Sequence, residues 1–576
     1  MPRLDEDRPR TKSPAAPIWR RLIAIAVLLV VAIAVLGTQY RSGQPREVSE
    51  AASERIACIS YAPFHKPGES PFDPQARVDP QRIHDDLQRL SARTSCVRTY
   101  SVAQGLDAVP AVAQELGMQV LLGAWLARDE TENTAELDRA IGLANEHPAS
   151  VRALIVGNEV LLRRELPAQA LAAHLDRAQR EAEVPVTYAD VWEFWVRNEE
   201  LAEHTDFVTI HILPYWEDEP IEVGAAVDHV IEIAQEVCGR FDRPILIGET
   251  GWPSKGRQRE GAVPSLVNQA EFVRSFVSAA EQADLDYNLI EAFDQPWKRS
   301  LEGAMGGYWG VLDSQAEPKF PWRGPVVEDV DADHGLIAAA LGAILGLLIA
   351  LATRLGPMGS LGAALLLAPT ASMLVRQWDY MQAWNRGPLE WAASGAWTLG
   401  GVALCLLAAP RLGQRLDGRT LTRLPAVARA LAPGVRDRLL PIGRLLLLAG
   451  AGAMAIMLVF DARYRGFPLP LYLMPGVTVA LLAWLGDRPP SSAAEERVLA
   501  LLLGAASLVV AFAEGPSNTQ AMLYCGLCIM IALGCWPRPL AGKAAPAGVA
   551  PGSPADQRRA STSREATTAA ADGSGE

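Results

Sequence analysis

Hydrophobic and polar positions divide the chain into two parts with different patterns. From 54 to 325, short apolar runs of strand length alternate with amphipathic stretches of helix length. From 335 to 536, the apolar runs are long and nearly free of charge, as is typical of membrane-spanning helices. We therefore expect an α/β domain followed by an all-α, multi-span transmembrane domain.

Eight apolar runs in the first part are candidate strands. They occupy residues 56–61, 96–100, 119–125, 152–159, 184–189, 207–212, 245–249 and 287–293. Candidate helices between them include residues 79–90, 135–146, 167–183 and 268–282. Eight strands that alternate with helices over about 250 residues predict a (β/α)₈ TIM barrel, in which the active site lies at the C-terminal ends of the strands.

Two of these strands end in a glutamate. The stretch V-R-A-L-I-V-G-N-E-V at 151–160 ends the fourth strand with Asn158 and Glu159, and I-L-I-G-E-T-G-W-P-S at 245–254 ends the seventh with Glu249. Cleavage of a glycosidic bond with retention needs two carboxyl groups roughly 5–5.5 Å apart, one to protonate the leaving oxygen and one to attack the anomeric carbon. A single strand-end glutamate is often only a solvated side chain, but two of them predict a catalytic pair.

Polar residues near this pair are candidate substrate contacts. Asn158 can hydrogen-bond a sugar 2-hydroxyl, or it can simply stabilise a turn. Glu291 and Asp294 end the eighth strand, where they can orient a sugar hydroxyl or shift the pKa values of the pair. The alternative for these two carboxylates is a salt bridge to a barrel arginine such as Arg98. His211 is the weaker candidate and can be a satisfied polar group inside the mouth.

Aromatic residues at the strand ends are further candidates. The tyrosines of this set are Tyr61, Tyr100 and Tyr215, and the tryptophans are Trp252 and Trp297. The Tyr215 phenol can hold the Glu249 carboxylate, although a rim position is equally consistent with the sequence. An indole offers a stacking plane for a pyranose ring, but tryptophans also pack in cores. We expect at least one of the two tryptophans to be a platform.

Four motifs together resemble glycoside hydrolase family 17. They are G-N-E at 157–159, P-Y at 214–215, G-E-T-G-W-P-S at 248–254 and E-A-F-D-Q-P-W-K at 291–298. That family comprises β-1,3-glucanases, lichenases and related glucan transglycosylases, and the resemblance covers roughly residues 55–325. It implies a (β/α)₈ barrel with Glu159 as acid/base and Glu249 as nucleophile. The chain departs from the family after Glu249, where the segment up to Asn268 is short and basic.

Charge and cysteine usage narrow the function classes. The net charge of -13 argues against a nucleic-acid partner. The eight histidines show no metal-ligand spacing and no phosphate-binding glycine loop is present, so we expect neither a metal nor a cofactor.

Cys58 and Cys96 lie on adjacent candidate strands, and we expect buried free thiols there, with a disulfide as the alternative. Cys525-x-x-Cys528 lies in an apolar run and is interpreted as packing.

The apolar runs predict eight membrane spans. Residues 1–17 form a polar N-terminus, 18–37 an uncleaved anchor (a signal peptide being the alternative) and 38–53 a linker. Seven further runs lie at about 335–353, 355–375, 391–409, 441–460, 468–486, 498–514 and 520–536. A tail rich in Ala, Pro, Gly, Ser and Thr at 537–576 is expected to be disordered.

Basic residues predict the orientation of these spans. The flank of Arg20 and Arg21 and the arginine-rich loop at 411–438, which includes Arg436, indicate cytoplasmic positions. Arg463 and Arg465 do not fit this pattern, because they lie in a loop that is predicted to be outside the cytoplasm. Arg444 is expected to snorkel to the cytoplasmic surface. We therefore expect a multi-pass protein of a bacterial inner (plasma) membrane, with a periplasmic or otherwise extracytoplasmic catalytic domain.

The sequence predicts a retaining enzyme that acts on β-1,3-glucan, as an endo-hydrolase when water is the acceptor or a transglycosylase when a glucan is. The expected partners are a β-glucan, the lipid bilayer and, as a candidate, a glucan synthase. One alternative is a non-catalytic glucan-binding subunit of a membrane polysaccharide synthase or exporter. The other makes the membrane half the functional core, as a carrier or synthase subunit.

Overall fold

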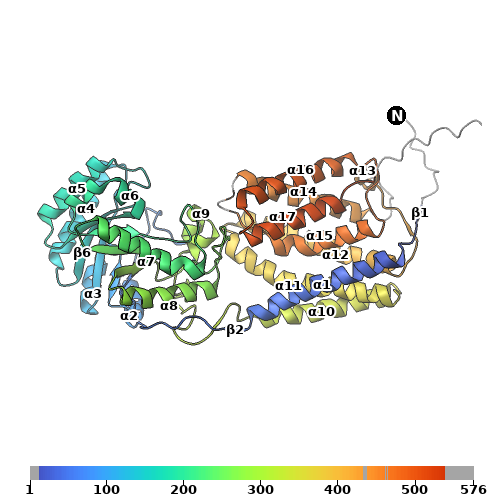
Figure 1. The fold of residues 1–576 in the computed structure, drawn as a ribbon, viewed down its shortest axis with the longest axis horizontal. Helices are drawn as coiled ribbons and strands as arrows, with labels where there is room; N and C mark the ends of the chain where they lie inside the picture. The colour runs from blue at the N-terminus through green and yellow to red at the C-terminus, as the bar shows by residue number, and fades with distance from the viewer. Residues whose placement is uncertain (1–11, 432–437, 461, 463–464, 539–576) are drawn as a thin grey trace, which may run out of the picture.

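The computed structural model describes residues 12–431, 438–460, 462 and 465–538. Figure 1 shows an α/β barrel next to a bundle of long helices, with the barrel lying beyond one end of the bundle. The predicted fold class is therefore confirmed. The expectations for residues 1–11, for Arg436 and Arg463, and for the tail after 538 fall outside the described residues.

The barrel is closed and consists of eight parallel strands in the order β10-β3-β4-β5-β6-β7-β8-β9. Their bounds are β3 Cys58–Ser60, β4 Cys96–Arg98, β5 Gln119–Ala124, β6 Val151–Asn158, β7 Val186–Val191, β8 Val208–His211, β9 Ile245–Thr250 and β10 Asp286–Leu289. Each strand overlaps one of the eight predicted runs. The strands are apolar and buried because helices cover the outer face of the barrel and side chains fill its interior.

Helices cover the outside of the barrel. They are α2 Pro80–Ser91, α3 Val109–Glu115, α4 Glu130–Glu146, α5 Ala168–Glu181, α6 Trp192–Arg197, α7 Val223–Arg240, α8 Leu266–Gln282 and the short α9 Arg299–Glu302. The four predicted helices correspond to α2, α4, α5 and α8. Helix α4 begins before its predicted start because the Asp129 carboxylate accepts hydrogen bonds from the backbone N–H groups of Thr131 and Glu132.

Cys58 and Cys96 form a disulfide, so the expectation of free thiols was wrong. The parallel register of β3 and β4 pairs Ile59 with Val97, which places the preceding cysteines side by side. Both cysteines are buried among apolar residues of the barrel interior such as Leu121. The other five cysteines are free thiols, and among them only Cys238 is exposed.

The helical bundle contains all seven helices expected after the barrel, and an eighth before it. Their bounds are α1 Ile18–Ser42, α10 Ala332–Ala352, α11 Pro357–Trp384, α12 Pro388–Leu416, α14 Leu439–Phe460, α15 Leu469–Trp484, α16 Ala494–Glu514 and α17 Thr519–Gly534. In the described part of the chain, six are long and apolar enough to cross a membrane, whereas α15 and α17 are shorter apolar helices. Helix α1 packs against α10 and α11 (Figure 1).

Two small strand pairs tie distant segments together. Strand β2 (Pro45–Arg46), just after α1, pairs antiparallel with β11 (Val326–Val327), just before α10. The chain therefore enters and leaves the barrel at one place. Strand β1 (Lys12–Ser13) pairs with β12 (Leu421–Thr422), and α13 (Val427–Ala430) follows β12.

Buried ion pairs lie near the end of the bundle that is remote from the barrel. Arg411 and Arg415 both contact Asp487, and they belong to α12 rather than to the predicted loop. Arg444 contacts Glu496, and both side chains are buried. The expectation that Arg444 snorkels was therefore wrong, because a carboxylate on the neighbouring helix α16 compensates its charge inside the protein.

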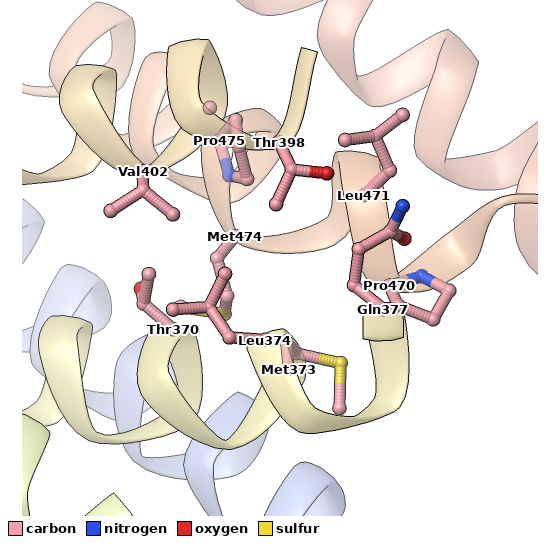
Figure 2. Close-up of a pocket in the computed structure, with 11 residues that line it drawn as sticks. Thr370, Met373, Leu374, Gln377, Thr398, Val402, Pro470, Leu471, Met474 and Pro475 are labelled. Carbon is pink, nitrogen blue, oxygen red and sulfur yellow. The ribbon is translucent and has the colours of Figure 1, made fainter. Parts of the chain in front are cut away.

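A small crevice of about 20 Å³ lies between α11, α12 and α15. Figure 2 shows Thr370 and Gln377 of α11 facing it, together with Thr398 of α12 and Pro475 of α15. Gln377 is almost fully buried, and its Oε1 atom has no hydrogen-bond partner among the described residues. This crevice is thus a polar interruption in an otherwise apolar helix interface.

The disulfide predicts the number of reactive thiols. Alkylation of the denatured, unreduced protein should modify five of the seven cysteines, and reduction should expose Cys58 and Cys96 as well. Because the bond closes a loop of sequence separation 38, its loss should lower the free energy of unfolding of the barrel by about 4 kcal/mol. Thermal unfolding of a Cys58→Ser/Cys96→Ser variant measures this loss, with Cys238→Ser as the control. Seven thiols without reduction would contradict the assignment.

Candidate active site

The glutamates at the ends of β6 and β9 lie at the same end of the barrel. Glu159 follows β6 directly, and Glu249 is the second-last residue of β9. One carboxylate oxygen of Glu159 and one of Glu249 lie within 4.8 Å of each other. The structure therefore brings the two predicted carboxylates together at the C-terminal ends of the strands.

Glu159 is held in an unusual backbone conformation. Its φ angle is +52°, and that of Gly157, two residues earlier, is +84°. This left-handed region disfavours a residue with a Cβ atom, so the surrounding structure has to impose it. The Glu159 backbone N–H donates to the Ala189 carbonyl at 2.7 Å. The turn leaves the Glu159 side chain 22% exposed, at the edge of the site where a ligand can reach it.

Glu249 is buried and surrounded by donors and positive charge. The Tyr100 hydroxyl donates to Glu249 Oε1 at 2.9 Å, and Arg98 Nη1 donates to the same oxygen at 3.3 Å. Burial by itself raises the pKa of the Glu249 carboxyl. The charges of His211, Arg98 and Lys298 and the Tyr100 hydrogen bond outweigh burial and hold this pKa below its ordinary value. Glu249 is therefore ionised at neutral pH.

Arg98, the last residue of β4, crosses the barrel interior and joins the two glutamate strands. Its Nη2 atom donates to Asn158 Oδ1 at 2.6 Å, and its Nη1 atom donates to the Gly248 carbonyl at 2.7 Å. The guanidinium is almost fully buried and lies over the Tyr100 ring. One cation thus fixes the amide before Glu159 and the backbone before Glu249.

His211, at the end of β8, lies between the two glutamates. Its Nδ1 atom is 3.0 Å from Glu159 Oε1, and its Nε2 atom is 3.7 Å from Glu249 Oε1. Gly248 permits this approach: a Cβ atom there would lie 3.1 Å from the imidazole and 2.5 Å from the Thr209 methyl group. The imidazole is fully buried and contacts both carboxylates.

The same three side chains form a group with metal-ligand geometry. In the described part of the chain, Glu159, His211 and Glu249 are the one set whose ligand atoms lie within 4.8 Å of one another. The Glu249 oxygen already contacts the Arg98 guanidinium. Because that fixed positive charge repels a cation, the arrangement favours an ionised carboxylate without a metal.

Glu291 and Asp294 are buried, and neither forms the salt bridge to Arg98 that was the alternative to a sugar contact. Lys298 Nζ donates to Glu291 at 2.7 Å, and Lys319 Nζ donates to Asp294 at 2.8 Å. Arg98 instead serves Glu249. Burial raises the pKa of Glu291 to about 7 and that of Asp294 to about 6, although each lysine opposes this shift.

Three of the predicted aromatic contacts are buried and form hydrogen bonds with groups other than the glutamate pair. The fully buried Trp252 donates from Nε1 to the Val263 carbonyl, so it is a core residue and not a platform. The Tyr215 hydroxyl donates to the Arg257 carbonyl at 2.6 Å rather than to Glu249. The Tyr61 hydroxyl donates to Asp86. The Tyr215 hydroxyl therefore does not hold the Glu249 carboxylate. A contact between Tyr61 and a sugar stays a prediction.

Two aromatic candidates remain near the mouth. Tyr100 contacts Glu249 directly, as described above. Trp297 is half-buried, donates from Nε1 to Gln295 and packs edge-on against the exposed Phe72. Trp297 lies after the end of β10, as predicted from the sequence. Its role as a stacking plane for a sugar ring stays a prediction.

Sequence reasoning underrated Arg98 and His211. Arg98 was considered only as a partner for Glu291 or Asp294, and His211 only as a polar filler. The sequence did contain a signal for a role of both residues at the site. The second predicted strand ends in R-T-Y at 98–100, and the sixth ends near His211. Both side chains therefore point from strand ends toward the pair, which the strand count alone places at one barrel mouth.

Comparison with known proteins places the barrel among glycoside hydrolases. Residues 58–310 match the family described as "BtgE/BtgC glycoside hydrolase domain". A glucan 1,3-beta-glucosidase of Saccharomyces cerevisiae is 24% identical over 258 residues, which are 41% of this chain and 82% of the relative. A glucan 1,3-beta-glucosidase of Candida albicans is 26% identical over 270 residues, covering 42% and 86%.

A solved structure is similar to about half of the chain. It is an active-site mutant of Rhizomucor miehei beta-1,3-glucanosyltransferase in complex with laminaritriose, with 26% identity and a TM-score of 0.42. The match covers 48% of this chain and 98% of that one. The family match and the two sequence relatives agree with the glutamate pair, and residues 58–310 accordingly form a glycoside hydrolase or transglycosylase domain similar to family 17.

Proposed function

We propose that this protein is a membrane-anchored, retaining enzyme that cleaves β-1,3-glucan and transfers the cleaved chain. The observation that carries the proposal is the approach of the Glu159 and Glu249 carboxylate oxygens to within 4.8 Å. Retaining glycosidases hold their carboxyl groups about 5–5.5 Å apart, whereas inverting enzymes leave about 6.5–9.5 Å for a water molecule. The names of the relatives support β-1,3-glucan as the substrate class.

The two carboxyl groups have separate tasks in this mechanism. Glu249 is ionised because Arg98, His211 and Tyr100 stabilise its negative charge. Its carboxylate attacks the anomeric carbon, the glycosidic bond breaks, and the leaving oxygen takes the proton of Glu159. Glu159 then accepts a proton from the incoming hydroxyl, which attacks the anomeric carbon and releases Glu249.

Neighbouring groups would orient the sugar ring. Arg98 occupies the Asn158 oxygen, so the Asn158 amide N–H group is the part that can donate to the sugar 2-hydroxyl. Trp297, half-buried at the mouth, is the available stacking plane. Glu291 and Asp294 are engaged with lysines, and their role is to hold the loops after β10 rather than to touch the sugar.

The acceptor decides whether hydrolysis or transfer results. A bundle with six helices of membrane-spanning length suits an enzyme that remodels a glucan as it leaves the membrane better than one that digests foreign polymer. We therefore favour glucan transfer, with a glucan synthase as the candidate partner. The alternative of a non-catalytic glucan-binding subunit is less favoured, because a binder has no use for an ionised carboxylate facing a second one.

The same architecture supports a location. We propose a multi-pass protein of the plasma membrane, with the barrel outside the cytoplasm and the connection between α12 and α14 inside. The arginines of that connection support this orientation. The assignment to a bacterial inner membrane stays a prediction, and the relatives named above are fungal.

The catalytic pair is tested with the purified full chain and a β-1,3-linked gluco-oligosaccharide of defined length. Glu249→Gln removes the nucleophile, and Glu159→Gln removes the acid, so each should lower kcat/KM at least about 10³-fold. Mass spectrometry of the wild-type reaction should show products both shorter and longer than the substrate. Only shorter products would make the enzyme a hydrolase. Equal turnover by the wild type and Glu249→Gln would refute the mechanism.

The contacts of Glu249 predict the acid limb of the pH profile of kcat/KM, which reports the free enzyme. Removal of a group that stabilises the Glu249 carboxylate raises its pKa, so the ionised nucleophile is lost at a higher pH. Tyr100→Phe and His211→Gln should both move this limb toward higher pH, and His211→Gln should move it further because the imidazole contributes more. Tyr61→Phe, which breaks a hydroxyl–carboxylate contact away from the pair, should leave the limb in place.

The proposed orientation is tested by thiol labelling of intact cells. The exposed Cys238 on α7 should react with a membrane-impermeant maleimide, and Cys238→Ser should abolish this labelling. A cysteine at the exposed position Arg419, introduced as Arg419→Cys in the Cys238→Ser background, should react only after permeabilisation. The reverse pattern would place the barrel in the cytoplasm.

A further inference from the structure

The loop between β9 and α8 connects the active site to the helical bundle. It begins immediately after Glu249 and Thr250, and its basic segment is where the sequence departs from family 17. Arg257 and Gln258 lie in this segment and are buried. Both contact the bundle, and in the described part of the chain their hydrogen-bond partners there lie in the connection between α14 and α15 and around the end of α16 and the start of α17.

Arg257 inserts into this end of the bundle. Its guanidinium forms an ion pair with Glu514, the last residue of α16, and donates to the Ala462 carbonyl between α14 and α15. It also lies over the Phe467 ring at 5.0 Å. The Arg257 and Glu514 side chains are 7% and 14% exposed. Removal of either partner leaves a desolvated charge without compensation, which is strongly unfavourable.

Gln258 binds the connection between α16 and α17. Its side-chain nitrogen donates to the Ser517 carbonyl at 3.0 Å, and its side-chain oxygen accepts from the Thr519 hydroxyl at 3.0 Å. Its backbone carbonyl accepts from Asn518 Nδ2 at 3.0 Å. Asn518 is the N-cap of α17, so the same contact ties the loop to the start of a bundle helix.

A chain of contacts runs from Arg257 back to the nucleophile. The Arg257 carbonyl accepts the Tyr215 hydroxyl hydrogen bond. The Tyr215 ring packs edge-on against Trp252 with centroids 6.1 Å apart, and Trp252 lies three residues after Glu249. All of these side chains are buried. A series of packed, buried side chains therefore connects Arg257 to the end of β9.

The loop after β10 makes a second contact with the bundle. Arg299 Nη1 donates to the Gln382 carbonyl at 2.9 Å, at the end of α11. The preceding residue, Lys298, pairs with Glu291, and its charge helps to hold the pKa of Glu249 down. The loops that follow β9 and β10, on one side of the barrel mouth, thus both rest on the bundle.

We propose that the barrel-facing end of the bundle is a positioning element of the active site, which fixes the loops after β9 and β10 and thereby selects the glucan chains that bind beside Glu249. This proposal rests on the proposed function. Glu514 and Arg257 are its positioning residues, and neither touches the reacting atoms. The basic segment after Glu249 then serves to dock the barrel on the membrane domain rather than to build sugar subsites.

The test uses the full chain in lipid nanodiscs and three variants. Glu514→Gln removes the charge that Arg257 needs, and Arg257→Lys keeps a cation with poorer geometry. Glu390→Gln is the matched control, because Glu390 pairs with Arg386 at the same end of the bundle in an exposed, local contact. KM, kcat and product lengths are measured with a β-1,3-linked gluco-oligosaccharide, and amide hydrogen exchange is measured over residues 245–262.

Glu514→Gln should raise KM about fivefold or more with kcat within about twofold, and it should change the share of products longer than the substrate. Exchange should become faster across residues 245–262, Arg257→Lys should give smaller changes, and Glu390→Gln should match the wild type. Unchanged KM and product lengths in Glu514→Gln would overturn the proposal, even if exchange became faster.

A wild type that turns over no glucan would instead refute the proposed function. The positioning role would then be decided by exchange alone. Faster exchange in Glu514→Gln that extends from Arg257 to Trp252 and Glu249 would support it. Exchange equal to that of the Glu390→Gln control would overturn it.

Discussion

The site depends on the burial of one guanidinium. Arg98 lies in the barrel interior, where a charge is tolerated only if partners compensate it. Those partners come from different strands: Asn158 from β6, Glu249 and the Gly248 carbonyl from β9, with His211 of β8 beside them. Closure of the barrel in the observed register is what brings these partners to one point. Fold stability and catalytic geometry therefore share a single electrostatic constraint.

Much of the fold followed from the sequence because its signals are periodic. Apolar runs located all eight strands, and the order of those strands placed Glu159 and Glu249 at the fourth and seventh strand ends. Parallel strands in a closed barrel bring their C-terminal ends to one face, so the pair could be predicted without any knowledge of loops. The long apolar runs located the bundle helices for a similarly simple reason, their length.

The positions of the remaining site residues depend on the course of the loops after the strands, which hydrophobic periodicity does not predict. Trp252 follows Glu249 in sequence, yet a loop carbonyl at Val263 draws its indole into the core. Glu291 pairs with Lys298, and Asp294 pairs with Lys319. Both lysines come from segments that follow the last strand. Asp294 and Lys319 are 25 residues apart in sequence, so the partner of that buried charge is set by the fold. The Cys58–Cys96 bond needed the lateral register of two strands as well as their identity.

The pairing of β2 with β11 has a consequence for the way the chain is assembled. Because the segments that enter and leave the barrel run together, the whole barrel is an insertion between α1 and α10, two helices that pack against each other. A bundle built this way can accept or lose a soluble domain without rearrangement of its helices. Two strands side by side also resist twisting more than a single tether does, so the barrel has little freedom to rotate over its support.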